Sequence, residues 1–140
     1  VDKYDTMCGI KMIKEGTMQL TQDKFGGTYH IKSYESGKVG INNEYYQESI
    51  IIMPEKLITP WRPKTFDQLC SAHFECLLAF EPDVVIVGTG ANFEWLDPVN
   101  YRCLIKKQIA VECMDSGAAC RTYTVLNSES RSVAVALILD

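Results

Sequence analysis

The spacing of apolar residues divides the chain into two halves. The first 47 residues carry turn signals and β-forming residues, and no helical period is present. A hairpin turn is predicted at the glycine pair 26–27. The predicted strands are Thr17–Thr21, Tyr29–Tyr34, Val39–Ile41 and Ser49–Met53. The last of these has three consecutive isoleucines, as in a strand covered on both faces, so we expect an N-terminal antiparallel meander that leads into the core.

From Thr65 onward, helical patterns alternate with buried strands. A helix is predicted from Thr65 to Glu81, with Gln68 completing a capping box. Later helices should begin at Asp97-Pro98 and at Asp115 or Ser116. The strands between and after the helices are Val84–Val87, Ile109–Cys113 and Ser132–Leu139. This alternation predicts an α/β fold, with a central mixed sheet, about three helices and the meander as additional β-structure.

The composition fits a single layered domain. The chain has 140 residues, of which 46% are hydrophobic and 23% charged, values typical of a globule with its own core. We therefore treat residues 1–140 as one domain, with 1–15 as a peripheral segment. The net charge of −4 argues against nucleic-acid binding, and no apolar run reaches the roughly 20 residues of a membrane span. The first residues lack the apolar core of an export signal, which predicts a cytoplasmic protein in a bacterium or a mitochondrial one in a eukaryote.

The cysteines predict no metal and no disulfide framework. All six occur within apolar patterns, without a C-x-x-C pair, so we expect reduced thiols in the core. The two histidines, His30 and His73, are far apart in sequence, and no spacing supports a Cys–His nucleophile or a zinc site.

A glycine-flanked threonine, Gly88-Thr89-Gly90, follows the strand at Val84. It is not a dinucleotide-binding loop, because Phe93 occupies the place of the third glycine, and the chain has no phosphate-loop lysine motif. No cofactor is therefore expected. The glycines either make a tight exit from the strand or let backbone amides and the Thr89 hydroxyl hold a ligand.

A second polar segment, Asp115-Ser116-Gly117, opens the last predicted helix. If the preceding strands are parallel, this segment and the glycine loop open at the same edge of the sheet, where α/β folds bind ligands. Free helix amides together with Arg121, and Arg131 in the turn beyond the helix, could hold a small anion there. The alternative is that the side chains cap the helix and that the arginines form ion pairs with nearby carboxylates.

Aromatic residues Phe93 and Trp95 lie just beyond the glycine loop. They either cover the end of the sheet or anchor a protein partner, since tryptophan and tyrosine dominate interface hot spots. An exposed strand of the meander could also pair two copies of the chain into a homo-oligomer.

Several segments together resemble a known family. They are SIIIMP from Ser49, Trp61, PDVVIVGTG from Pro82, and IAVECMDSGAACRTYTVLNSESRSVAVALI from Ile109. The chain resembles, over about residues 16–139, the small proteins that include mitochondrial respiratory complex I assembly factor three and bacterial and archaeal proteins of unassigned chemistry. The resemblance implies a compact α/β domain and no established reaction. Ser130 departs from it, because family members often have glycine there.

Two classes of function follow. The first is a non-catalytic interaction or assembly protein, which the missing acid–base and metal sets and the resemblance both favour. The second is an anion-binding protein or enzyme that uses the crevice of Thr89, Asp115, Ser116 and Arg121.

Overall fold

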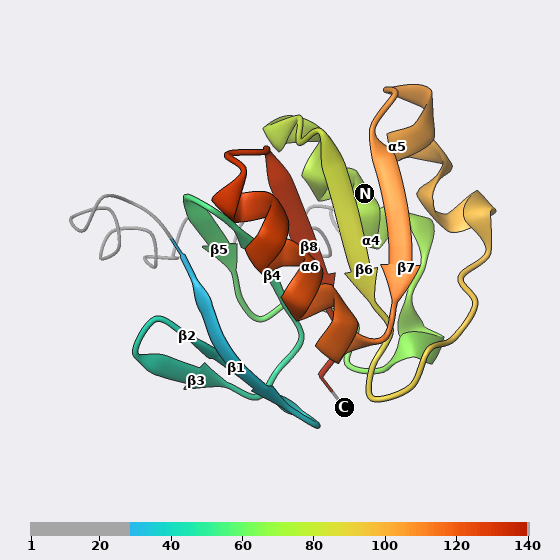
Figure 1. The fold of residues 1–140 in the computed structure, drawn as a ribbon. Helices are drawn as coiled ribbons and strands as arrows, with labels where there is room; N and C mark the ends of the chain where they lie inside the picture. The colour runs from blue at the N-terminus through green and yellow to red at the C-terminus, as the bar shows by residue number, and fades with distance from the viewer. Residues whose placement is uncertain (1–28, 140) are drawn as a thin grey trace.

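The computed structural model describes residues 29–139 (Figure 1). The strand expected at Thr17–Thr21 and the turn at 26–27 lie outside the described residues. Within them, eight strands form two sheets. The α/β class, the mixed central sheet and the N-terminal meander predicted from the sequence are confirmed.

The central sheet has five strands in the order β5-β4-β8-β6-β7. The strands are β4 (Ile50–Met53), β5 (Lys56–Ile58), β6 (Val84–Gly88), β7 (Ala110–Met114) and β8 (Val133–Leu137). β6 lies parallel to both β7 and β8, whereas β4 runs antiparallel to β8 and β5. Every residue of β4, β6 and β8 is buried, as their unbroken apolar sequences predicted.

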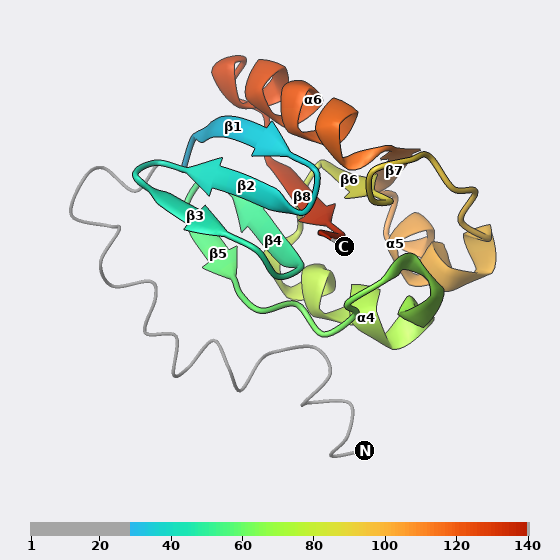
Figure 2. The same cartoon turned by 90° about the horizontal axis from the view of Figure 1, so that it is seen from below.

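Alternate residues of these strands pack into two cores, one on each face of the sheet. Val85 and Val87 of β6 join the core beneath the short helices, with Phe74 and Leu104. Val84 and Ile86 point the other way, toward Tyr123 of α6 (Ser116–Ser128). Figure 2 shows the sheet between α6 on one side and α4 (Ser71–Glu75) and α5 (Arg102–Lys106) on the other.

The meander forms a separate three-stranded antiparallel sheet, β1-β2-β3. Its strands are β1 (Ile31–Glu35), β2 (Lys38–Ile41) and β3 (Glu44–Tyr46). Val39 and Ile41 of β2 share the core of α6 and the central sheet. The buried hydroxyl of Tyr123 on α6 donates to the Tyr29 carbonyl oxygen at 2.8 Å, which ties the start of the meander to the helix.

The prediction of one continuous helix from Thr65 to Glu81 is wrong. The segment instead forms a 3-10 turn (Phe66–Gln68), the five-residue helix α4 and a second 3-10 turn (Cys76–Phe80). The Thr65 side chain makes no capping bond, and Gln68 Oε1 accepts from the Lys64 amide at 2.8 Å. The capping box forms five residues later, between Cys70 and His73.

The other two helices begin where the sequence predicted. Asp97 Oδ1 accepts from the Val99 amide at 3.1 Å and begins a 3-10 turn (Pro98–Tyr101) that runs into α5. Asp115, rather than Ser116, caps α6 through a 2.8 Å bond from the Ala118 amide to Oδ1. Among residues 29–139, no helix is long and apolar enough to cross a bilayer.

Candidate functional site

The loops that follow β6 and β7 meet at one edge of the central sheet, because the two strands are parallel and Gly88 lies opposite Met114. Backbone bonds join them: the Thr89 amide donates to the Met114 carbonyl at 2.9 Å, and the Ser116 amide donates to the Gly90 carbonyl at 2.8 Å. The structure therefore brings Gly88–Gly90 together with Asp115 and Ser116.

The Ser116 hydroxyl is fully buried between these loops and the end of β8. Its Oγ accepts from the Gly90 amide at 2.9 Å and donates to the Ile138 carbonyl at 2.9 Å. One side chain thus satisfies two buried backbone groups from different strand ends. Ser116 holds this edge of the sheet together.

Gly88 is required at its position by close packing. A Cβ atom there would lie 2.7 Å from Ser116 Oγ and 2.9 Å from Ser116 Cα, which is backbone and cannot move aside. This contact supports the tight-exit interpretation of the first glycine of the loop.

The amino end of α6 has few amides left for a ligand. Among the first four amides, that of Ser116 donates to Gly90, that of Ala118 to the Asp115 carboxylate, and that of Ala119 to the Asp115 carbonyl. Capping and inter-loop bonds therefore satisfy most of the donors that an anion would need.

The two candidate arginines lie at different ends of α6. Arg121 is exposed in the second turn of the helix. Arg131 follows the helix at the opposite edge of the sheet, where the chain enters β8. A helix of 13 residues is roughly 20 Å long, so the structure does not bring Arg131 to the crevice of Thr89 and Ser116.

Ser130 closes α6 in a left-handed conformation, with φ of 62°. The Arg131 amide donates to the Leu126 carbonyl at 3.1 Å and the Ser130 amide to the Asn127 carbonyl at 3.0 Å, which is the bond pattern of a Schellman motif. This motif favours glycine at the Ser130 position, and it gives a physical reason for the glycine expected from the family.

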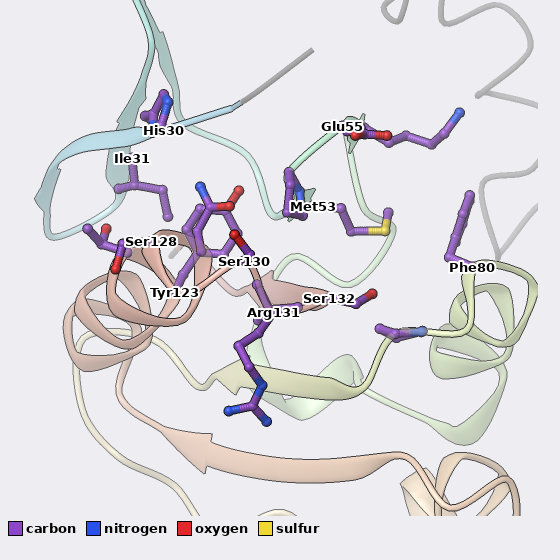
Figure 3. A pocket seen from close by; sticks show the side chains of 16 residues that line it. His30, Ile31, Met53, Glu55, Phe80, Tyr123, Ser128, Ser130, Arg131 and Ser132 are labelled. Atoms are coloured by element: carbon purple, nitrogen blue, oxygen red, sulfur yellow. The ribbon is translucent and has the colours of Figure 1, made fainter. Parts of the chain in front are cut away.

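Arg131 belongs to a separate pocket of about 1120 Å³ (Figure 3). The pocket lies at the amino ends of β6 and β8, and its lining includes His30, Glu55, Lys56 and Tyr123. Sequence reasoning missed it, because its residues come from distant parts of the chain and share no motif.

The Thr89 hydroxyl holds the aromatic loop. Thr89 is 2% exposed; its Oγ1 donates to the Asn92 carbonyl at 2.9 Å and accepts from the Glu94 amide at 3.0 Å. These two bonds fix the backbone on both sides of Phe93. Thr89 thus stabilises the loop that follows the glycine segment.

The held loop presents its aromatic side chains to solvent. Phe93 is 57% exposed and Trp95 is 67% exposed, while Leu96 behind them is buried. The expectation that these rings cover the end of the sheet does not fit such exposure. Leu96 anchors the loop, and the two larger side chains are left outward.

The structure brings together a thiol and an imidazole that the sequence did not predict to be neighbours. Cys70 is an exposed thiol, and its Sγ lies 3.6 Å from Nδ1 of His73. We expected every cysteine to lie in the core, and this is wrong for Cys70. We also expected no spacing to support a Cys–His pair, and this is wrong for Cys70 and His73. The helical spacing of three residues was the available signal. Cys76, Cys103, Cys113 and Cys120 also form no disulfide within the described residues, and Cys8 lies outside them.

Within the described chain, no three His, Cys, Asp or Glu side chains gather in a way that could hold a metal ion.

Comparison with known proteins assigns the family. The model described as "Protein of unknown function (DUF498/DUF598)" matches residues 31–138. The chain belongs to this family. The resemblance inferred from SIIIMP, PDVVIVGTG and the segment after Ile109 is confirmed.

Two similar proteins illustrate what is known of the chain's relatives. The chain is 30% identical over 111 residues to the Bos taurus protein named NADH dehydrogenase (ubiquinone) 1 alpha subcomplex assembly factor 3, and the match covers 78% of this chain but 60% of that protein. It is 27% identical over 124 residues to the "13 kDa major membrane protein" of Francisella tularensis subsp. holarctica, covering 86% of this chain and 99% of that protein.

The fold is also known from experiment. A crystal structure of a Bordetella parapertussis protein superposes with a TM-score of 0.76 at 30% identity, covering 81% of this chain and 98% of that one.

Proposed function

We propose that this chain is a non-catalytic protein-binding factor of the assembly-factor type, and that the loop carrying Phe93 and Trp95 is its docking surface. The observation that carries this proposal is the combination of exposed rings and a backbone held by the buried Thr89 hydroxyl.

The held backbone matters because it lowers the entropy cost of binding. Ordering a mobile loop on association consumes part of the interaction energy, whereas a loop that is already fixed keeps it. Large rigid side chains such as Phe93 and Trp95 bury much apolar area when a partner covers them. Exposed rings on a fixed loop therefore fit a protein-docking role.

The relatives support the same class of function. One relative is named as an assembly factor for a respiratory complex, and such a factor acts on other proteins. On this basis the partner of the present chain is a subunit that awaits incorporation into a larger complex. A cytoplasmic location in a bacterium, or a mitochondrial one in a eukaryote, belongs to the same proposal.

The competing function is anion binding at Thr89, Asp115, Ser116 and Arg121. The hydroxyls of Thr89 and Ser116 each make two bonds to the protein backbone, which favours a structural role for both. The exposed guanidinium of Arg121 is the group through which this hypothesis is tested.

The test is affinity capture from the source cells followed by reconstitution with the purified partner. The bait variants are wild type, the double variant Phe93→Ala/Trp95→Ala, and Val125→Ala, which removes an apolar side chain 54% exposed on α6. We expect wild type and Val125→Ala to retain one partner and the double variant to lose it.

Thr89→Val separates the rings from their support. It keeps the shape and both aromatic side chains but removes the two bonds that hold the loop, so we expect weaker partner binding with folding retained. Equal binding by all four proteins would remove the loop from the proposal.

A further inference from the structure

A thiol and an imidazole lie together at the start of α4, on the side of the molecule opposite α6. Cys70 Sγ and His73 Nδ1 are 3.6 Å apart, and Cys70 is exposed. We propose that Cys70 is a reactive thiol that exchanges with small disulfides, with His73 Nδ1 as the base that takes its proton.

The hydrogen bonds of the imidazole assign its tautomer. The Cys70 amide donates to Nδ1 at 3.1 Å, so Nδ1 carries a lone pair and the ring proton resides on Nε2. The lone pair therefore faces the side of the ring on which the Cys70 thiol lies. The amide and the thiol compete for this one lone pair, so a thiol that gives its proton to Nδ1 displaces the amide hydrogen bond.

The ring is held in place by its surroundings. His73 is 6% exposed, and its carbonyl accepts from Trp61 Nε1 at 3.3 Å and from Cys76 Sγ at 3.5 Å. The Trp61 ring packs edge-on against the imidazole, with ring centroids 6.1 Å apart. The packing keeps the ring beside the nucleophile, so proton transfer requires exchange of the amide bond at Nδ1 but no movement of the ring.

The charge state of the imidazole suits a base. Burial lowers the pKa of His73, and the positive charge of Arg62 lowers it further. Arg62 acts on the ring through its charge, and the Cys70 thiol lies beside Nδ1. The ring therefore stays neutral, and able to accept a proton, at pH values near 7.

Four further cysteines of the described chain provide a comparison for Cys70. Cys76 and Cys120 are buried, and burial raises the pKa of Cys120 to about 12. Burial also raises the pKa of the half-buried Cys113. These thiols, with Cys103, are internal controls within the same molecule.

The disulfide is the only oxidant that the exchange step requires. Cys70 Sγ attacks one sulfur of the disulfide R–S–S–R, and the new Sγ–S bond forms as the old S–S bond breaks. The thiol proton moves to His73 Nδ1, which loses its hydrogen bond from the Cys70 amide, and then to the departing thiolate, which leaves as R–SH; the amide bond to Nδ1 forms again. The product is a mixed disulfide on Cys70.

The experiment treats the native full chain with glutathione disulfide, quenches with acid, and measures modification at each cysteine by peptide mass spectrometry. We expect Cys70 to react at least about tenfold faster than Cys103 or Cys113. The matched variant is His73→Gln, because glutamine can maintain the capping box from this position but cannot take the proton. We expect it to slow Cys70 about tenfold or more and to leave the other cysteines unchanged.

A pH series gives a second readout. In wild type the Cys70 rate should rise only weakly with pH above the lowered pKa of His73, because the base is already present. In His73→Gln the Cys70 rate should rise more steeply with pH than in wild type, because the internal base is missing. If that variant fails to fold, the wild-type profile of Cys70 against Cys103 decides.

Three results would overturn the proposal. They are a Cys70 rate equal to that of Cys103, a rate unaffected by His73→Gln, and a wild-type pH profile of Cys70 as steep as that of His73→Gln or of Cys103. The last two would leave the pair as a helix cap only.

Discussion

Replacing Ser116 by alanine removes the hydroxyl that joins three elements at the carboxyl edge of the sheet. In the native protein this hydroxyl accepts from the Gly90 amide and donates to the Ile138 carbonyl, and the side chain is fully buried. In the variant, the Gly90 amide and the Ile138 carbonyl stay buried, and each loses one hydrogen bond. The gap of a single oxygen atom is too small to admit water in its place.

The size of the effect follows from those two groups. Leaving a buried donor or acceptor unpaired costs about 1–3 kcal/mol. The Ile138 carbonyl has a second lone pair and is the less severe loss, so we expect Ser116→Ala to lower the free energy of unfolding by about 2–4 kcal/mol. This is a large share of the roughly 5–15 kcal/mol that stabilises a typical domain.

Urea denaturation followed by circular dichroism measures this change. The control is Ser128→Ala, which removes an exposed hydroxyl bonded to the Val125 carbonyl on the same helix and should change stability by no more than about 0.5 kcal/mol. The midpoint should fall for Ser116→Ala with an unchanged slope. A loss no greater than that of the control would refute the account of this edge.

Three further predictions concern other parts of the molecule. Ser130→Gly should raise the free energy of unfolding by about 0.5–1 kcal/mol, because glycine adopts the left-handed Schellman position without strain; Ser130→Ala should not, and equal urea midpoints for the two variants would contradict this. Tyr123→Phe should cost about 1–2 kcal/mol by the same assay, since it leaves the buried Tyr29 carbonyl without the hydroxyl; an unchanged midpoint would mean that this bond contributes nothing. If the anion hypothesis holds, Arg121→Ala should weaken phosphate binding, followed by amide NMR shifts, more than Lys106→Ala does; absence of shifts at millimolar phosphate leaves Arg121 without this role.

The sheet and its order of elements could be predicted because the signals are local. Unbroken apolar runs mark β4, β6 and β8 as strands covered on both faces, and their alternation with helical patterns implies parallel neighbours. Asp97 and Asp115 are strong helix caps within one turn of the groups they bind. Such features need only a few residues of sequence.

The region from Thr65 to Glu81 was mispredicted because two caps compete. Thr65 and Gln68 form a conventional capping box in sequence, yet Leu69 and Cys70 adopt extended backbone angles and restart the helix at Ser71. Cysteine is not a recognised N-cap, so the sequence favoured the box at Thr65 and Gln68 over the one that forms between Cys70 and His73. Packing of Phe74 and Leu77 into the core accompanies this arrangement.

The role of Ser116 could not be predicted for a different reason. As a serine beside a helix start, it was a reasonable cap, but its hydroxyl partners lie 26 and 22 residues away in sequence. The same holds for the exposure of Phe93 and Trp95, which depends on how the loop is held. Long-range pairings of this kind require the assembled fold.

The central claim is that the aromatic loop held by Thr89 binds a protein partner, and its most direct test is the dissociation constant for the purified partner. Calorimetric titration should show Phe93→Ala/Trp95→Ala weakened by at least about 30-fold relative to wild type, the size of a hot-spot loss of about 2 kcal/mol, with Val125→Ala unchanged. Equal dissociation constants for wild type and the double variant would contradict the account.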